Sequence, residues 1–266
     1  IVGLLAEAAR KQGRLLGQMQ TAGLLLRDEA LLQTLTQDVL KSSEIEGESL
    51  NEKQVRSSIA RRLGLASAGM VPSSRNVDGV VEMLVDATQS FRDELTEEKL
   101  FCWHRQLFPA PAGPFGSIRV GTWRDDASGP MQVVSGPVGR TTVHFEAPAA
   151  ASVPQEMAAF LAWYNAADDE DKLLKAAIAH LWFVTIHPFD DGNGRLARAI
   201  TDRMLARAED SACRFYSLST QICHERSAYY EALEDAQKGS LDITEWIRWF
   251  LQCFLRVLAH VGHTLS

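Results

Sequence analysis

One twelve-residue stretch, HPFDDGNGRLAR at residues 187–198, concentrates side chains that could handle phosphate groups. The Gly-Asn-Gly turn at 192–194 can point several backbone N–H groups in one direction, which makes a nest for an anion. A helix that begins at this turn adds the positive end of its dipole. Arg195 and Arg198 share one face of that helix's first turn and could grip two phosphates of one polyphosphate.

His187 and Asp191 could supply the remaining chemistry of such a site. A histidine can take a proton from an attacking hydroxyl near neutral pH. A carboxylate among phosphates repels them unless it helps to hold a divalent metal, and Mg²⁺ is usually bound by one or two carboxylates plus phosphate oxygens. Phe189 is expected to point the other way and anchor the loop. Each feature alone is typical of an ordinary cap, turn or solvated helix, but their coincidence favours a phosphate site.

The position of residues 187–198 depends on the elements expected before and after them. Pro188 disfavours helix at the residue before it. We therefore expect the apolar run DKLLKAAIAHLWFVTI to form a central buried helix. This helix should end near Ile186, with His187 directly after its last turn. A second helix should begin at the Gly-Asn-Gly turn.

Helical periodicity recurs along most of the chain, as in the stripe of Leu31, Leu32, Leu35 and Val39. Residues 109–148 break this pattern because they are rich in proline and glycine. Within them, MQVVSG and TTVHF are short β-prone runs that predict a hairpin. Long loops in compact domains usually serve a function. The sequence thus predicts an all-α fold that carries one extended flap.

Composition excludes several classes of protein. The 266 residues are 46% hydrophobic and 23% charged, with a net charge of -7, which argues against a nucleic-acid-binding surface. No apolar run reaches about 18 residues, so no membrane span is expected. The start reads as an amphipathic helix rather than a secretory signal, and it lacks an initiator Met, so we expect a trimmed start. The scattered cysteines, Cys102, Cys213, Cys223 and Cys253, are typical of reduced thiols in a cytoplasmic protein.

The motif supports a resemblance to a known family. HPFDDGNGRLAR matches, position by position, the His-x-Phe-x-(Asp/Glu)-Gly-Asn-Gly-Arg-x-x-Arg motif of Fic proteins, and GTWR, MQVVSG and RSAYYEALEDAQKG also resemble bacterial members. The resemblance implies an all-α Fic-type domain of about eight core helices with a β-hairpin flap. It divides the chain into an N-terminal helical region, 1–95, with inhibitory helices, and a Fic domain, 96–266. It also implies transfer of AMP from ATP to a Ser, Thr or Tyr hydroxyl of a target protein, with pyrophosphate leaving.

The resemblance carries roles to matching positions of this sequence. His187 resembles the general base, and Asp191 resembles the Mg²⁺ ligand. The residues expected to bind the nucleotide are Gly192, Asn193, Gly194, Arg195, Leu196, Ala197 and Arg198, with Tyr229 and Gln237 closing the adenine pocket. Tyr229 and Gln237 also fit an ordinary core helix. The flap residues Val133, Val134, Ser135 and Gly136 would hold the target peptide by strand addition.

A second motif resembles an inhibitory element of the same family. SSEIEGESL, at 42–50, matches (Ser/Thr)-x-x-x-Glu-(Gly/Asn) through Ser42, Glu46 and Gly47. In relatives this implies that the glutamate pairs with Arg198, so that Arg198 cannot hold the γ-phosphate, while Ser42 steadies Glu46. Without the resemblance, the same residues would be typical of an acidic helix end with a glycine C-cap.

Several functions remain open at this level. The leading interpretation is self-inhibited AMP transfer to a target protein or to the chain itself. The alternatives are transfer of UMP or phosphocholine, a kinase, removal of AMP from a target with Glu46 orienting a water, and an ATP-binding regulatory module without catalysis. The intact Gly194-Arg195 pair favours nucleotidyl transfer over a kinase. Similar chains often continue into a winged-helix segment, which we expect to be absent here. The target, and the choice between monomer and homodimer, also stay open.

Overall fold

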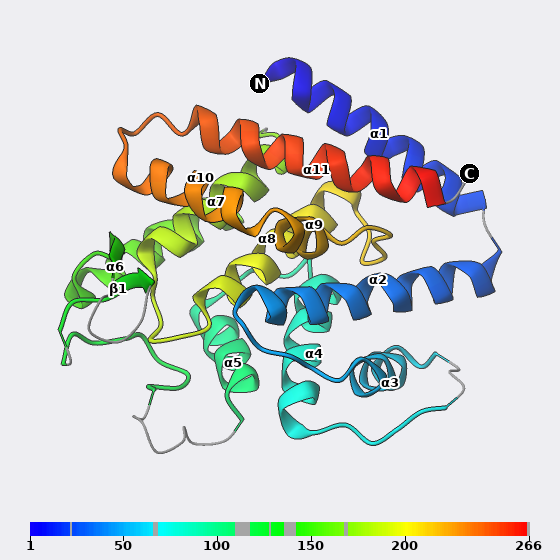
Figure 1. The fold of residues 1–266 in the computed structure, drawn as a ribbon, viewed down its shortest axis with the longest axis horizontal. Helices are drawn as coiled ribbons and strands as arrows, with labels where there is room; N and C mark the ends of the chain where they lie inside the picture. The colour runs from blue at the N-terminus through cyan, green and yellow to red at the C-terminus, as the bar shows by residue number, and fades with distance from the viewer. Residues whose placement is uncertain are drawn as a thin grey trace.

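The computed structural model describes residues 1–21, 23–65, 69–109, 118–127, 129–135, 142–167 and 170–264, with side chains to residue 261. Its helices are α1 (Val2–Thr21), α2 (Leu24–Ile45), α3 (Glu52–Leu63), α4 (Arg75–Gln89), α5 (Glu97–Leu107), α6 (Val153–Asn165), α7 (Lys172–Ile186), α8 (Asn193–Glu209), α9 (Leu218–His224), α10 (Arg226–Lys238) and α11 (Thr244–Thr264). A short 3₁₀ turn, η1 (Ala150–Ser152), precedes α6. Strands β1 (Gln132–Ser135) and β2 (Thr142–Glu146) complete the fold (Figure 1). The predicted all-α architecture with a hairpin flap is confirmed.

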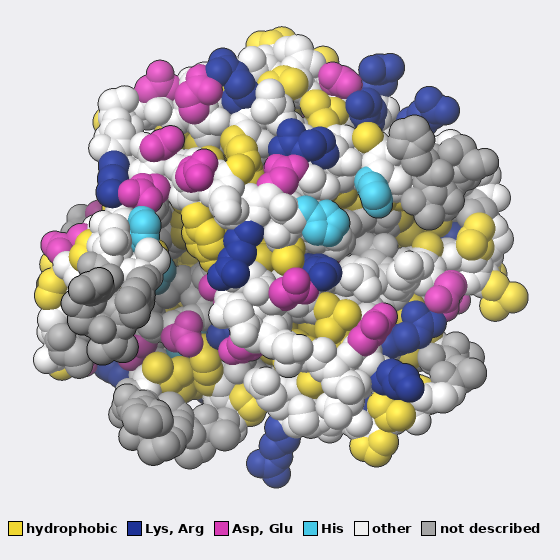
Figure 2. Space-filling model, viewed as in Figure 1, with side chains coloured by type: hydrophobic (Ala, Val, Ile, Leu, Met, Phe, Trp, Pro, Cys, Tyr) yellow, Lys and Arg dark blue, Asp and Glu magenta, His cyan; other side chains and the backbone are white. Residues whose placement is uncertain are grey.

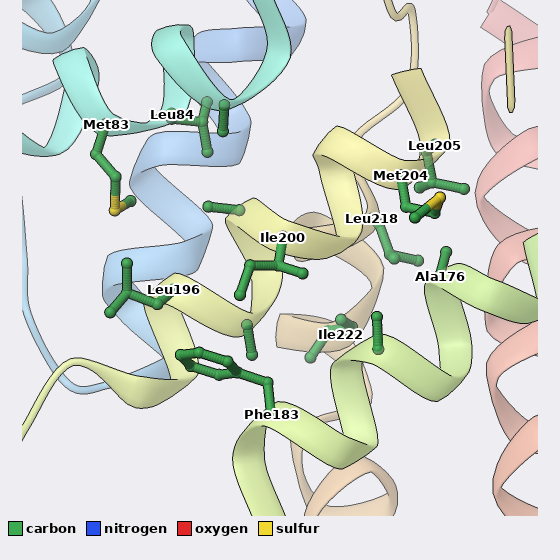
Figure 3. Packing of buried hydrophobic residues seen from close by; sticks show 14 of the residues in the cluster. Met83, Leu84, Ala176, Phe183, Leu196, Ile200, Met204, Leu205, Leu218 and Ile222 are labelled. Atoms are coloured by element: carbon green, nitrogen blue, oxygen red, sulfur yellow. The ribbon is translucent and has the colours of Figure 1, made fainter. Parts of the chain in front are cut away.

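Helices α7 and α8 form the centre of the molecule and make the most extensive contact between any two elements described. Helix α7 ends at Ile186, as its sequence predicts, and α8 begins at Asn193. Figure 3 shows Leu196, Ile200 and Met204 of α8 packed among side chains from α4, α7 and α9. Because α8 is covered on nearly all sides, its first turn is held rigidly at the edge of the core.

The long helix α2 brings the amino-terminal part of the chain to the start of α8. It packs against α3 and α9 and also contacts α8, while α1 lies beside α11 (Figure 1). The helix ends at Ile45, and Gly47 follows in the left-handed region with a φ of 82°. Glycine adopts this conformation without a steric penalty, so the chain can turn sharply directly after Glu46.

A buried ionic cluster fixes α2 against the core. Arg214 lies between two carboxylates, with its Nη2 3.1 Å from Asp38 Oδ2 and its Nη1 bonded to Asp202 of α8, and all three side chains are at most 2% exposed. Ser217 donates a hydrogen bond to Asp38 Oδ1 at 2.6 Å. Burial and the neighbouring Asp202 raise the pKa of Asp38 to about 7. One guanidinium therefore compensates two buried carboxyl groups at the junction of α2, α8 and the segment before α9.

The predicted flap is confirmed as an antiparallel hairpin of β1 and β2. Val133 pairs with Phe145 and Val134 pairs with Val143, so His144 is an extra residue that forms a bulge in β2. Gly136, predicted as part of the flap's binding edge, lies outside the described residues.

The surface agrees with the charge balance of the sequence. Figure 2 shows basic and acidic side chains interspersed over the face that it presents, rather than one broad basic patch. All four cysteines are free thiols. Among the helices described, none is both long and apolar enough to cross a bilayer.

We expect Arg214→Met to lower the free energy of unfolding by about 3–5 kcal/mol, because it leaves two buried carboxylates without their cation. Urea unfolding at pH 7.5, followed by circular dichroism, measures this loss. The matched control is Arg92→Met, which removes an ion pair with Asp210 whose side chains are 69% and 78% exposed. That change should cost less than about 1 kcal/mol. Equal losses from the two variants would show that the buried cluster does not anchor α2.

Candidate functional site

A pocket of about 650 Å³ opens where the flap, the start of α8 and α10 meet the end of α2. Eight residues singled out from the sequence line it together: Glu46, Val133, Val134, Ser135, His187, Gly194, Tyr229 and Gln237. These residues come from five separate parts of the chain, and the fold gathers them around one space.

The loop between α7 and α8 is held from inside by Phe189 and Asn193. Phe189 is fully buried and stacks on His104 of α5, with ring centroids 4.1 Å apart. The Asn193 side chain accepts a hydrogen bond from the Phe189 N–H at 3.0 Å and donates one to its carbonyl at 2.8 Å. Phe189 therefore anchors the loop as predicted. The Asn193 side chain holds the loop, which leaves only its backbone N–H for an anion.

Two further residues, Arg124 and His104, hold this loop from outside the motif, and neither was predicted as a site residue. Arg124 donates from its Nε to the His187 carbonyl at 2.7 Å and from its backbone N–H to the Pro188 carbonyl at 2.9 Å. His104 accepts from the Gly121 N–H at 2.9 Å, so its other ring nitrogen donates to the Asp191 carbonyl at 3.1 Å. In the sequence, the only indication of a role for Arg124 is its position in the family-like GTWR segment.

His187 is placed to act as a base. It caps α7 in the left-handed region with a φ of 51°, a strained conformation for a residue other than glycine. Its Nδ1 lies 3.1 Å from the Val184 carbonyl, which requires a proton on Nδ1 and leaves Nε2 as an acceptor. Burial lowers the pKa of His187 below its usual value of 6.5. The imidazole is therefore neutral at pH 7 and can accept a proton.

Arg198 is bonded to Ser42 and Glu46 at the end of α2. It is 2% exposed, and its Nη2 lies 2.8 Å from Glu46 Oε1. Its Nε and Nη2 also donate to the hydroxyl and the carbonyl of Ser42, each at 2.8 Å. The expected pairing of Glu46 with Arg198 is thus present. The expected role of Ser42 needs correction, because its hydroxyl is bonded to Arg198 rather than steadying Glu46.

A second carboxylate of the same segment occupies the other arginine. Glu48 Oε2 lies 2.7 Å from Nη1 of Arg195, whose side chain is 2% exposed, and the Arg195 guanidinium also lies over the Phe108 ring at 5.1 Å. Glu48 is not one of the positions that match the inhibitory motif. In the sequence, Glu48 is marked only as a second acid two residues after Glu46, across Gly47.

Space and unsatisfied donors mark where an anion would lie. Within the described residues, Arg198 Nη1 and Arg195 Nε are buried without a hydrogen-bond partner. A Cβ added to Gly194 would run into the Glu46 carboxylate and would lie 3.3 Å from Arg198 Nη1. The Glu46 carboxylate therefore sits against the first turn of α8, at the positive end of the helix dipole. The protein's own acid occupies the position that suits a phosphate.

Leu196 and Ala197, which were predicted to bind the nucleotide, have side chains that face the core instead. Both are fully buried, and Figure 3 shows Leu196 among the buried hydrophobic residues of the core. They lie on the inner faces of α8, opposite to those of its first-turn arginines. Their side chains pack the helix in place and do not line the pocket.

Tyr229 serves the core and the pocket at once. It is 2% exposed, and its hydroxyl is bonded to His180 Nε2 at 2.8 Å, while His180 Nδ1 contacts Thr201 at 2.9 Å. Burial lowers the pKa of His180 to about 3, so this histidine is neutral. Gln237 donates to Thr185 at 3.3 Å. Both predicted residues line the pocket, but only the buried Tyr229 also fits the core interpretation, since Gln237 is half-buried.

Asp191 could help to bind a metal only if a bound nucleotide supplied further oxygen ligands. Its side chain is exposed beside the Gly-Asn-Gly turn, and its Oδ1 accepts from the Gly192 N–H at 2.6 Å. In the part of the chain that the structure describes, no three His, Cys, Asp or Glu residues are grouped to hold a metal. This donor set fits Mg²⁺ whose remaining ligands are phosphate oxygens and water.

Comparisons with known sequences agree with this geometry. The model of the Fic/DOC family matches residues 94–205, and a domain of unknown function, DUF4172, matches residues 1–65. The protein adenylyltransferase Fic of Nematostella vectensis is 28% identical over 248 residues, 89% of this chain and 51% of that protein. Its counterpart in Culex quinquefasciatus is 36% identical over 106 residues, 38% of this chain and 19% of that protein. The chain thus spans about half, or less, of these curated relatives.

Solved structures confirm the Fic-type fold. A Fic family protein from Desulfovibrio desulfuricans G20 superposes with a TM-score of 0.71 and 24% identity, covering 99% of this chain and 74% of that one. A Fic domain containing signaling protein from Bacteroides thetaiotaomicron gives a TM-score of 0.68 at 19% identity, covering 97% and 95%. The N-terminal helices and the core are therefore arranged as in these proteins.

We expect Glu48→Gln to tighten the binding of inorganic triphosphate about fivefold, since a half-exposed ion pair is worth roughly 1 kcal/mol. The change frees Arg195 for the anion, and titration calorimetry measures the dissociation constant. Glu44→Gln is the matched control, because Glu44 lies on the same helix end but pairs with Lys41. An unchanged constant for Glu48→Gln would show that Arg195 does not meet the anion.

Proposed function

Since this chain carries a Fic/DOC family domain at residues 94–205, we propose that it transfers AMP from ATP to a hydroxyl group of a protein. One observation supports this most directly. Two buried arginines at the start of α8 each have an N–H group without a partner among the described residues, and they lie next to a pocket that is lined by a neutral His187. Relatives bearing the name protein adenylyltransferase agree with the proposal.

The chemistry follows from the positions of these groups. The backbone N–H groups of Asn193 and Gly194 and the two arginines would bind the phosphates of ATP and stabilise the charge that develops on them. A target hydroxyl would attack the α-phosphorus and give its proton to His187 Nε2. The new bond joins the hydroxyl oxygen to phosphorus, the bond between the α-phosphorus and its bridging oxygen to the β-phosphate breaks, and pyrophosphate leaves.

Asp191 would hold Mg²⁺ next to these phosphates. When bound, the ion would neutralise phosphate charge and favour departure of pyrophosphate. The exposed position of Asp191 beside the turn supports this assignment.

The flap would present the target. Strand β1 carries Val133, Val134 and Ser135 along the pocket, and Val134 is 49% exposed. A target segment that adds as a further strand to this two-stranded sheet would lie extended across the pocket opening, with its hydroxyl side chain directed inward.

The segment after α2 would keep this site inactive. With Glu46 on Arg198 and Glu48 on Arg195, neither guanidinium is free to hold a polyphosphate. ATP would then bind without the arginine contacts that align its α-phosphorus for attack. Glu46 also lines the same pocket as His187, so the reverse activity, removal of AMP from a target, is the second candidate.

We expect His187→Ala to lower AMP transfer to other proteins roughly 10²–10⁴-fold, while ATP binding stays within about twofold. A proton acceptor acts on the reaction step rather than on the bound ground state. In the parent, the rate should fall as pH drops through the lowered pKa of His187, below 6.5. Radiolabel transfer and calorimetry measure the two quantities. Full activity in His187→Ala would remove this residue from the mechanism.

We expect Glu46→Gly to raise AMP transfer about 10- to 1000-fold, because each 1.4 kcal/mol released from the Arg198 contact is tenfold in rate. Label on protein from α-labelled ATP measures AMP transfer, and label from γ-labelled ATP alone would indicate a kinase.

Arg198→Ala added to Glu46→Gly should cancel the gain, since the freed guanidinium is then absent. Loss of AMP removal from a modified target in Glu46→Gly would favour the second candidate. Saturable ATP binding with no label in any variant would contradict both enzymatic proposals.

A further inference from the structure

Three side chains around the flap form a hydrogen-bonded array that the proposed transfer reaction does not use. Ser135 Oγ at the end of β1 lies 2.6 Å from His144 Nε2 on β2. His144 Nδ1 lies 2.7 Å from Glu234 Oε2 on α10. A carboxylate only accepts hydrogen bonds, so Nδ1 carries the proton, and Nε2 of a neutral ring is then the acceptor for the Ser135 hydroxyl. The array therefore has the order hydroxyl, base and orienting carboxylate.

The fold aims this histidine through a backbone irregularity. His144 is the extra residue of the bulge in β2, since its neighbours Val143 and Phe145 pair with adjacent residues of β1. Bulges redirect a side chain and are frequent next to active sites. Glu234 is itself held by Lys238, whose Nζ bonds to its other carboxylate oxygen. The imidazole is thus fixed from both sides.

The array lies in the pocket proposed for the nucleotide. Ser135, His144 and Glu234 line the same pocket as His187 and Gly194. Ser135 is also exposed, so a group attached to its hydroxyl has room. A serine hydroxyl bonded to a fixed imidazole is a better nucleophile than an isolated serine, because its proton has an acceptor at hand.

We propose that Ser135 is a site of self-modification, at which the chain accepts AMP from its own bound Mg-ATP. This inference rests on the proposed AMP transfer. The Ser135 oxygen attacks the α-phosphorus and its proton passes to His144 Nε2. The bond from the α-phosphorus to the oxygen that bridges it to the β-phosphate breaks, so the products are AMP-Ser135 and pyrophosphate. His144 acts as the base, and Glu234 is a positioning residue that keeps the imidazole in the correct tautomer.

This modification would have a consequence for the flap. Ser135 belongs to the strand that is proposed to hold the target, so an AMP group there would lie across the edge where the target adds. Self-modification would then limit transfer to other proteins once the inhibitory segment has been released.

The experiment uses the full chain with Glu46→Gly, which is expected to be active, incubated with Mg-ATP. Peptide mapping by mass spectrometry should find AMP on Ser135, and Ser135→Ala should lose that label. Thr142→Val is the matched control, because Thr142 pairs with Ser135 across the hairpin and also carries an exposed hydroxyl. This control should keep the label on Ser135.

His144→Gln separates a base from a structural tie. Glutamine can accept a hydrogen bond and donate another, but it cannot take the proton, so labelling of Ser135 at saturating Mg-ATP should fall roughly 10²–10⁴-fold. A rate equal to that of the parent would overturn the assignment of His144 as the base. If His144 only held the flap in place by hydrogen bonds, His144→Gln would label Ser135 at the parent rate.

The outcomes also separate this inference from the proposed function. AMP on other residues or on other proteins of a cell lysate, with Ser135 unlabelled, would overturn the self-modification site and leave the proposed transfer standing. AMP on no protein at all would overturn the proposed function and this inference with it.

Discussion

The ion pair between Glu46 and Arg198 joins the end of α2 to the first turn of α8, where the proposed phosphate site lies. A guanidinium that is 2% exposed is stable only when its charge and its N–H groups are compensated. Glu46 and Ser42 supply that compensation from α2, and a polyphosphate would supply it in their place. The same buried cation therefore suits two partners that exclude each other, and the proposed self-inhibition rests on this competition.

The geometry of α2 makes this competition local. Asp38, Ser42 and Glu46 follow one another at intervals of four, so they lie on one face of the helix or at its end. The first reaches Arg214 in the buried cluster and the other two reach Arg198. Moving all of α2 would separate buried charges, which is costly. Displacing only Glu46 and the residues that follow it leaves this cluster and the Ser42 contacts intact, so the Glu46–Arg198 pair can separate without movement of the whole helix.

The flap is connected to the pocket by polar contacts rather than by a core of its own. Its two short strands expose Val134 and Val143, and His144 bonds to Glu234 of α10. A two-stranded hairpin is marginally stable by itself. The link to α10 therefore gives the flap a defined position over the pocket, and the proposed chemistry at Ser135 uses the same contacts.

The sequence by itself determined the features that are encoded locally. The motif at 187–198 is contiguous, Pro188 ends the preceding helix, and apolar periodicity marks the buried faces, so the pocket mouth, the start of α8 and the hairpin could all be predicted. The family resemblance added the pairing of Glu46 with Arg198. Only the tertiary structure decided the contacts between residues far apart in the chain. Glu48 meets Arg195 across 147 residues, Asp38 meets Arg214 across 176, and His144 meets Glu234 across 90. It also decided that Leu196 and Ala197 face the core. Because α8 is buried on nearly all sides, the apolar periodicity of its sequence does not show which side of the helix is directed to the pocket.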